Sequence, residues 1–321
     1  MMNLSNAADR LLERVERLQN PSVIGLDPVV TSLPCCYLSV AQQLTGNEAV
    51  ATAYTEWGRD VIDAVWDIVP AVKPQMAFYE AYGAAGVRAF EQTVAYAKAR
   101  GLIVIEDAKR GDIGNTARAY ADGHLGQVAG IGEESFSSYD VDFLTVSPFL
   151  GGDSLQPLIE TALKHGKGIF VLVKTSNPGA DDVQGARCSD GRTVSEKLAD
   201  LVAAAGACTV GGYGYAPIGA VVGATRPGDA VALRKRMPHS LLLIPGYGAQ
   251  GGDAAGAVAA LDNRGLGGLV NSSRGVLYQH LTDELRNSCT REEYRQRVRA
   301  AAIAMRDDLA VAISKRESST R

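Results

Sequence analysis

Residues 101–116 read GLIVIEDAKRGDIGNT, an apolar run that ends in charged residues and leads toward a helix. The run at 102–106 is short and rich in β-branched side chains, which is typical of a buried strand. Side chains alternate across a strand, so Asp107 and Lys109 are expected on the same side, with Asp112 in the turn beyond. Charges gathered between a strand and a helix are where α/β enzymes place their chemistry. A solvated charge cluster on a loop is the alternative reading of this segment alone.

The alternation of apolar strand and amphipathic helix recurs along the chain. Eight strands are predicted, at residues 23–26, 71–72 running into Lys73, 102–106, 143–146, 169–173, 220–222, 241–244 and 268–270. Seven helices are predicted between them, at 54–69, 79–99, 116–128, 155–165, 193–205, 227–236 and 253–261. This order predicts an α/β fold of the (β/α)8 TIM barrel type. A doubly wound open sheet is the alternative, but it explains less well why polar residues follow nearly every strand.

We expect residues 1–321 to form a single barrel domain with an N-terminal helix, long loop insertions and a C-terminal helical tail. Three long connections, at 29–53, 124–142 and 177–192, are interpreted as insertions on the barrel faces. Surface loops accept such added length at little entropic cost. Residues 290–321 mix charged and apolar residues at helical spacing, which predicts a covering helix with a frayed polar end.

Composition limits the classes of function. Hydrophobic residues make up 46% and charged residues 21%, as in an ordinary globular protein, and a net charge of −4 gives no electrostatic footprint for nucleic acid. No apolar stretch has the length of a membrane helix, and the N-terminus lacks the apolar core of a signal peptide. The five cysteines, an odd number, do not look like a disulfide framework. We therefore expect a cytoplasmic protein without a nucleic-acid or membrane partner.

Polar residues follow most of the predicted strands. Asp27 ends the first strand, and Lys73 ends the second, where the following proline holds it in extended geometry. The fifth strand leads into Lys174-Thr175-Ser176-Asn177-Pro178-Gly179. Each residue alone is explained more simply as a turn former or a solvated charge. Their joint occurrence at one end of successive strands is what favours a functional site.

The segments after the last two strands predict a phosphate site. Residues 245–253 read PGYGAQGGD, and glycines let backbone N–H groups approach an anion at the start of the following helix. Barrels frequently bind phosphate between the loops after strands seven and eight. Arg274 offers a planar bidentate donor for phosphate oxygens, and Gln250 adds an amide N–H. A dinucleotide site is not expected, because this glycine pattern follows the seventh strand rather than the first.

Lys73, Asp107, Lys109 and Asp112 suggest an alternating chain of positive and negative groups in a partly dry pocket. Each charge is flanked by its opposite, which keeps all four ionised. A carboxylate held next to a substrate carboxylate repels it, while a nearby lysine is attracted to a developing carbanion, so the arrangement suits loss of CO2 and protonation by the lysine. Metal ligation is the competing use of the carboxylates, but the four histidines are scattered and none pairs at ligand spacing. The residues therefore give no strong support for a metal site.

Residues 107–116, DAKRGDIGNT, closely resemble the orotidine 5′-phosphate decarboxylases of the longer bacterial type. The likeness extends over almost the whole barrel, through residues 26–28, 72–74, 221–225, 245–252 and 273–275. It implies decarboxylation of orotidine 5′-monophosphate to UMP and CO2, the last step of de novo pyrimidine nucleotide biosynthesis, without a metal or an organic cofactor. The three long connections and the tail depart from shorter family members.

The resemblance also implies roles for the charged residues. Lys109 is expected to donate the proton to C6 of the pyrimidine, and Asp107 to crowd the substrate carboxylate. Lys73 and Asp27 are expected to contact the ribose hydroxyls.

Further roles follow from the same resemblance. Asp112 and Thr116 are expected to reach into the site of a second subunit, so that the active enzyme is a homodimer with shared active sites. Ser176 is expected to address the pyrimidine ring, and Gln250 and Arg274 the phosphate.

Two other functions remain open. A sugar-phosphate lyase or aldolase of the same barrel group shares the D-x-K-x-x-D pattern but uses Mg²⁺. Those relatives place an acid where this chain has Lys73, and a lysine there would repel a divalent cation. A barrel that binds phosphorylated ligands without catalysis is the second alternative, and the presence of all four charged residues disfavours it.

Overall fold

A closed barrel of parallel strands forms the centre of the computed structural model, which describes residues 6–248, 251–278 and 281–320. The barrel strands are β1 (Ser22–Leu26), β2 (Ala71–Pro74), β3 (Ile103–Arg110), β6 (Phe143–Val146), β7 (Gly168–Lys174), β8 (Ala216–Val222), β9 (Ser240–Ile244) and β10 (Gly268–Ser272). Their order around the barrel is β1-β10-β9-β8-β7-β6-β3-β2, and β1 pairs with both β10 and β2. The predicted (β/α)8 barrel is confirmed, and every predicted strand overlaps an observed one.

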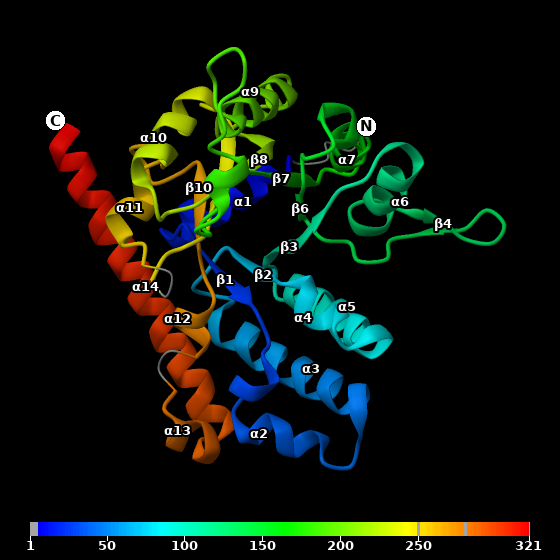
Figure 1. Ribbon diagram of the computed structural model, residues 1–321. Coiled ribbons are helices and arrows are strands. Elements are labelled where there is room, and N and C mark those ends of the chain that lie inside the picture. The colour runs from blue at the N-terminus through cyan, green and yellow to red at the C-terminus, as the bar shows by residue number, and fades with distance from the viewer. Residues whose placement is uncertain (1–5, 249–250, 279–280, 321) are drawn as a thin grey trace.

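Helices surround the barrel (Figure 1). The longer ones are α1 (Ala7–Leu18), α3 (Gly46–Val65), α5 (Gly83–Ala99), α6 (Gly114–His124), α7 (Gly152–Lys164), α9 (Val194–Gly206), α10 (Pro227–Arg236) and α14 (Arg291–Thr320). The shorter elements are η1 (Val30–Ser32), α2 (Cys35–Leu38), η2 (Ser39–Ala41), α4 (Met76–Glu80), α8 (Ala180–Val183), α11 (Ala254–Val258), α12 (Arg274–Leu277) and α13 (Asp283–Ser288), with a small hairpin of β4 (Val128–Ala129) and β5 (Ser135–Phe136). Every predicted helix overlaps an observed one.

The barrel strands are buried on both faces, because helices cover the outside and side chains fill the inside. Successive side chains alternate between these two environments. On β3, Ile103 and Ile105 belong to the apolar cluster inside the barrel, whereas Val104 packs between the sheet and the helices. The same alternation carries Glu106 outward, where its Oε2 atom lies 2.8 Å from Nδ1 of the buried His124 on α6.

The inner apolar cluster includes α1 as well as the strands. Leu11 and Leu12 of α1 are fully buried and belong to the same cluster as Phe143 and Phe170 of the barrel interior. Helix α1 therefore closes one end of the barrel with apolar side chains. The cavity described below opens at the other end, where the strands finish.

The long connections contain more structure than the sequence predicts. The connection 29–53 holds η1, α2 and η2, and α3 begins at Gly46, earlier than expected. The connection 124–142 contains the β4–β5 hairpin, and 177–192 contains α8. The predicted helix 79–99 is divided into α4 and α5, with Gly83 in the left-handed region at φ 58°.

The C-terminal helix α14 runs along the outside of the barrel, as Figure 1 shows. It packs against α3, α11 and α12, and Trp57 of α3 donates a hydrogen bond of 2.8 Å to the hydroxyl of Tyr294. Tyr247, in the loop after β9, donates a hydrogen bond of 2.7 Å to Asp308 of α14. Of the helices that the structure describes, none has the length and apolar composition needed to cross a membrane.

Candidate active site

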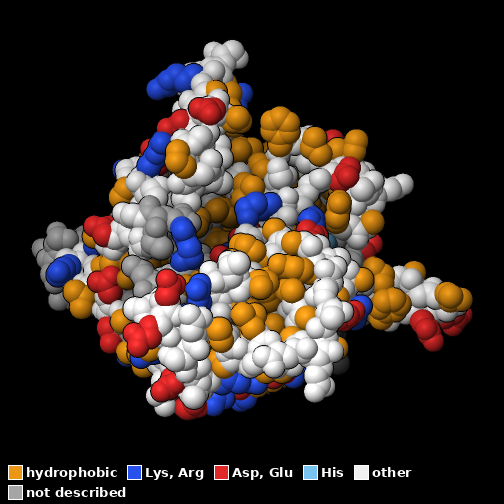
Figure 2. All heavy atoms as spheres, turned by 60° about the horizontal axis from the view of Figure 1, so that its bottom comes forward, with side chains coloured by type: hydrophobic (Ala, Val, Ile, Leu, Met, Phe, Trp, Pro, Cys, Tyr) orange, Lys and Arg blue, Asp and Glu red, His pale blue; other side chains and the backbone are white. Residues whose placement is uncertain are grey.

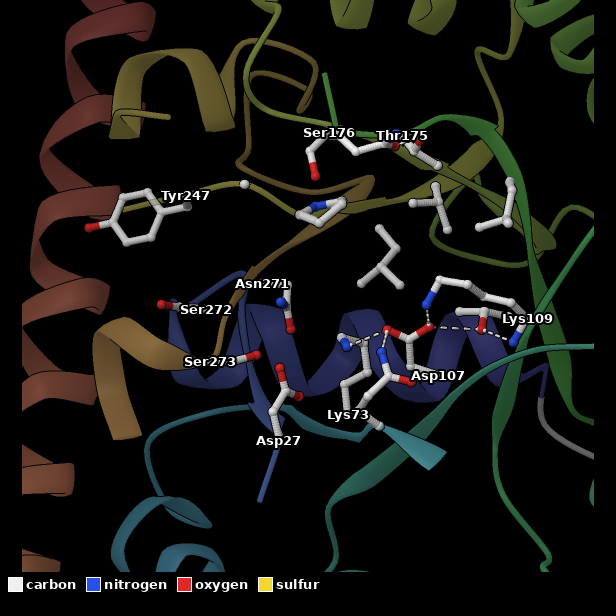
Figure 3. Close-up of a pocket in the computed structure, with 18 of the residues that line it drawn as sticks. Asp27, Lys73, Asp107, Lys109, Thr175, Ser176, Tyr247, Asn271, Ser272 and Ser273 are labelled. Carbon is white, nitrogen blue, oxygen red and sulfur yellow. Dashed lines mark hydrogen bonds and ion pairs between the residues drawn. The ribbon is translucent and has the colours of Figure 1, made fainter. Parts of the chain in front are cut away.

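A cavity of about 490 Å³ lies among the C-terminal ends of the barrel strands. Its apolar lining comes from Leu172, Val221 and Leu243, and the rest of its wall is largely polar. Figure 3 shows Asp107 on one side of the cavity and Ser176 on the opposite side, with its hydroxyl directed into the space between them. The sequence-predicted strand ends therefore meet at one place.

Asp107 accepts hydrogen bonds from four side chains. Its Oδ2 atom lies 2.6 Å from Lys73 Nζ and 3.0 Å from Gln75 Nε2. Its Oδ1 atom lies 2.5 Å from Lys109 Nζ and 3.1 Å from Thr145 Oγ1. The carboxylate is thus held rigidly between two ammonium groups, as Figure 3 also shows.

The two lysines determine the charge of this cluster. Burial alone would raise the pKa of Asp107, but the ammonium groups of Lys73 and Lys109 hold it well below its usual range. Burial alone would lower the pKa of Lys73, but the carboxylates of Asp107 and Asp27 raise it above its ordinary value. Asp107 and Lys73 are therefore both ionised at neutral pH.

A backbone irregularity orients Lys109. The pairing of β3 with β6 shifts register between Glu106 and Arg110, and Lys109 has a φ of 51°, which few residues other than glycine adopt. The Lys109 backbone N–H donates to Thr145 Oγ1 at 3.0 Å. Such a conformation costs about 1–3 kcal/mol and is found mainly at functional sites. The predicted same-side placement of Asp107 and Lys109 is confirmed, with a bulge added to the simple strand alternation.

Asp27 lies at the end of β1 beside β10. The chain approaches closely there. A Cβ atom added to Gly25 would lie only 1.9 Å from Ser273 Oγ, so the absence of a side chain at Gly25 permits the approach. Asp27 Oδ1 and Asn271 Oδ1 are buried acceptors that receive no hydrogen bond from the residues that the structure describes. Buried acceptors without donors are costly, so both atoms suit a ligand that brings hydroxyl or N–H groups.

Of the predicted phosphate-binding residues, the structure describes Arg274, which lines the cavity together with Gly246 of the loop after β9. Arg274 is the first residue of α12, and its side chain is exposed and lines the cavity. Gly246 and Gly248, in the loop after β9, have φ of 107° and 73°, so both positions require glycine. Gln250 lies outside the described residues.

Asp112 and Thr116 do not line this cavity. Asp112 Oδ1 accepts a hydrogen bond of 2.8 Å from the backbone of Ile113. Thr116 lines a separate surface depression with Tyr120 and His124. Within one chain, the structure therefore joins three of the four predicted charges, and Asp112 is apart from them.

Several polar residues of the cavity had no role in the sequence prediction. Gln75 follows Lys73 by two positions, so strand alternation alone could have indicated it. Asn271 stands at a recognised strand end without an assigned role. Thr145 and Gln184 carry no such signal, because only the register of β6 and the path of the 177–192 connection bring them to the site.

The described residues contain no group of three or more His, Cys, Asp or Glu side chains arranged to hold a metal ion. Asp27 and Asp107, two carboxylates of the cavity wall, both raise the pKa of Lys73. The polar groups that line the cavity are therefore a mixture of ammonium, amide, hydroxyl and carboxylate groups.

A closed parallel barrel with an ion-paired carboxylate and two lysines at its strand ends defines a TIM-barrel enzyme. The sequence model of the orotidine 5′-phosphate decarboxylase / HUMPS family matches residues 54–281. This chain belongs to the orotidine 5′-phosphate decarboxylase family.

Similar proteins match over nearly the full chain. The orotidine 5′-phosphate decarboxylase of Rhodopirellula baltica is 44% identical over 302 residues, which cover 94% of this chain and 98% of that protein. The orotidine 5′-phosphate decarboxylase of Clostridium tetani is 42% identical, covering 96% and 99%. Among solved structures, Leishmania donovani OMP decarboxylase is similar with a TM-score of 0.70 and 30% identity, covering 96% of this chain and 99% of that one.

Proposed function

We propose that Asp107, Lys109 and Lys73 carry out the decarboxylation of orotidine 5′-monophosphate in this cavity. The chain is an orotidine 5′-phosphate decarboxylase, which converts this nucleotide to UMP and CO2 in pyrimidine biosynthesis. The observation that carries the residue assignment is the buried Asp107 carboxylate, held ionised between two lysines at the cavity wall.

The charges suit a reaction in which a carboxylate leaves. Ionised Asp107 repels a substrate carboxylate placed beside it, and this repulsion disappears when CO2 departs. The C6–carboxyl bond breaks, its electron pair stays on C6, and the Lys109 ammonium stabilises that charge before donating a proton to C6. UMP results, and the neutral Lys109 regains a proton from solvent. Lys109 is half-exposed at the cavity, which permits both steps.

Asp27 and Lys73 are proposed to bind the ribose hydroxyls. Asp27 Oδ1 is a buried acceptor without a donor among the described residues, and Asn271 Oδ1 beside it is another. Ribose hydroxyls supply the missing donors. The Lys73 ammonium faces Asp107 and Asp27, so it can orient a hydroxyl between the sugar and the reacting end of the site.

Ser176 is proposed to face the pyrimidine, and Gln250 and Arg274 the phosphate. Ser176 lies across the cavity from Asp107, and Arg274 lines the cavity together with residues of the glycine loop after β9. Phosphate binding far from the reacting carbon supplies binding energy on which catalysis can draw.

Replacing Arg274 with alanine is expected to raise KM for orotidine 5′-monophosphate roughly 10- to 100-fold, because a charge-assisted hydrogen bond to phosphate is lost. Steady-state kinetics measure the effect. Arg264→Ala serves as the control, since Arg264 is an exposed arginine paired with Asp262. Unchanged KM in the Arg274 variant would contradict a phosphate-binding role.

Protein treated with EDTA is expected to consume orotidine 5′-monophosphate at the rate of untreated protein. The reason is that the proposed chemistry uses only the charges of Asp107 and the two lysines. The fall in ultraviolet absorbance of the substrate measures the rate. A requirement for added Mg²⁺, or turnover of sugar phosphates only, would instead support a metal-dependent lyase of the same barrel group.

We propose a homodimer in which Asp112 and Thr116 complete the partner's site. Both residues lie outside the cavity of their own chain, at the start of α6. Large apolar side chains are exposed nearby, with Ile113 57% exposed and Phe149, which follows β6, 82% exposed. Figure 2 shows hydrophobic side chains gathered over one face of the molecule, which is typical of a surface that is covered in an assembly.

Mixing Lys109→Ala protein with Asp112→Ala protein is expected to restore activity. Each hybrid dimer would hold one intact site, built from Lys109 of one subunit and Asp112 of the other, and an equal mixture would reach about one quarter of wild-type activity. The measurement is turnover before and after subunit exchange. An activity equal to the mean of the two separate variants would mean that Asp112 does not act across the interface.

We also propose a cytoplasmic location and a single barrel domain spanning residues 1–321. The five cysteines are all free, which suits a reducing compartment. The strands nearest the two termini, β1 and β10, pair with each other, and α14 packs on α3, so both ends of the chain support one barrel.

A further inference from the structure

The cavity wall opposite Asp107 is attached to the 177–192 connection through Gln184. Gln184 follows α8, is half-buried and lines the cavity. Its Oε1 atom accepts a hydrogen bond of 2.8 Å from the Thr175 backbone N–H. Its Nε2 atom donates a hydrogen bond of 2.9 Å to Thr175 Oγ1. One side chain thus binds both the backbone and the side chain of the residue that precedes Ser176.

These two hydrogen bonds fix the direction of a third. A backbone N–H can only donate, so the Gln184 carbonyl oxygen must face Thr175 N and its amide must face Thr175 Oγ1. The Thr175 hydroxyl is then free to donate its own proton, and it does so to Asn177 Oδ1 at 2.6 Å. Gln184 therefore sets the direction of the hydrogen bond from Thr175 to Asn177, the residues on either side of Ser176.

Ion pairs hold helix α8, which directly precedes Gln184. Asp181 of α8 accepts from Lys174, the last residue of β7, and from Arg226, which precedes α10. The hydrogen bonds from Arg226 and Lys174 lower the pKa of Asp181 to about 2, so this carboxylate stays ionised. The Lys174 side chain is only 7% exposed. Helix α8 is therefore tied to the end of β7 and to the residue that precedes α10.

Ser176 has little freedom on its other side. A Cβ atom on Gly223 would lie 3.0 Å from Ser176 Cα, and one on Gly246 would lie 3.4 Å from Ser176 Cβ. The loops after β8 and β9 thus press directly against this residue, and glycine permits that approach. With Gln184 holding Thr175, the position of Ser176 is fixed from both sides.

We propose that Gln184 is a positioning residue that holds the pyrimidine-facing segment Thr175–Asn177 in its binding geometry; this rests on the proposed placement of the pyrimidine at Ser176. Gln184 acts through Thr175, and it contributes to the binding affinity for the base of the nucleotide. The groups proposed for the phosphate and the ribose, Arg274, Asp27 and Lys73, come from other strands, and the described hydrogen bonds of Gln184 go to Thr175 and to none of them.

The test compares two ligands that differ by the base. Gln184→Met keeps the length of the side chain and removes both hydrogen bonds, and is expected to weaken UMP binding roughly tenfold while ribose 5-phosphate binding changes less than about twofold. Isothermal titration calorimetry measures both affinities. Gln156→Met is the matched control, because Gln156 is an exposed glutamine on α7 bonded only to Glu160 among the described residues. It should leave both affinities unchanged.

Asp181→Asn provides a second variant that leaves Gln184 in place but weakens the hold on α8, and a smaller loss confined to UMP is expected. Equal weakening of UMP and ribose 5-phosphate in the Gln184 variant would indicate a general disturbance of the barrel and overturn the proposal. Unchanged UMP affinity would overturn it as well. Wild-type protein that binds ribose 5-phosphate but neither binds UMP nor decarboxylates orotidine 5′-monophosphate would instead refute the proposed function on which the inference rests.

Discussion

Lys109→Ala protein is expected to lose at least about a thousandfold in kcat for orotidine 5′-monophosphate while still binding UMP. The variant lacks both the cation that stabilises charge on C6 and the acid that protonates it, and each effect alone is worth about a hundredfold or more. Binding survives because the groups proposed for phosphate and ribose, Arg274 and Asp27, remain. Single-turnover kinetics and calorimetry with UMP separate the two quantities.

The matched control for this variant is Lys197→Ala. Lys197 is another partly exposed lysine, whose Nζ atom lies 3.3 Å from Asp190 on the surface. Its removal should change kcat by less than about twofold, since surface ion pairs contribute little. Retention of most activity by the Lys109 variant would show that the proton reaches C6 from another donor.

Asp107→Asn is expected to lower kcat by a similar factor and also to destabilise the fold. The amide cannot repel the substrate carboxylate, so the effect that favours loss of CO2 disappears. It also leaves the buried Lys73 without its nearest counter-charge, which costs about 3–5 kcal/mol in the free energy of unfolding. Urea unfolding and steady-state kinetics measure the two consequences in the same protein.

A double variant distinguishes the catalytic effect from the structural one. Adding Lys73→Met to Asp107→Asn removes the unpaired buried charge, so part of the lost stability should return while turnover stays low. Full activity in the double variant would mean that Asp107 serves only to keep Lys73 stable. Full stability in the single variant would mean that Asp27 alone compensates Lys73.

Strand periodicity explains how much of the barrel can be predicted from the sequence. The short apolar runs mark all eight strands, because parallel strands buried on both faces need nearly continuous apolar residues. The prediction of one continuous helix at 79–99 is wrong, because two helices, α4 and α5, occupy this range. The break between α4 and α5 falls beside Gly83, which has a φ of 58°, and a Cβ atom on Gly86 would lie 1.9 Å from the Tyr79 carbonyl oxygen. Apolar periodicity does not indicate this close approach.

Some residues of the candidate site can likewise be predicted from the sequence, and others cannot. Lys73, Asp107 and Lys109 are predictable because they extend recognisable strands, and alternation places them inside the barrel end. Thr145 and Gln184 are not, because their positions depend on a register shift between β3 and β6 and on the path of an insertion. The strained φ of Lys109 is likewise set by packing around β3, since lysine has no intrinsic preference for it.

Helix α1, whose leucines join the apolar cluster inside the barrel, has a consequence for how small molecules move. Among the described residues, that end of the barrel is packed with buried apolar side chains, which do not favour passage of water or ions. In the part of the chain that the structure describes, the cavity at the strand ends is then the route for reactant, products and the solvent that reprotonates Lys109. A nucleotide bound in this cavity therefore lies on the path by which solvent reaches the part-exposed Lys109.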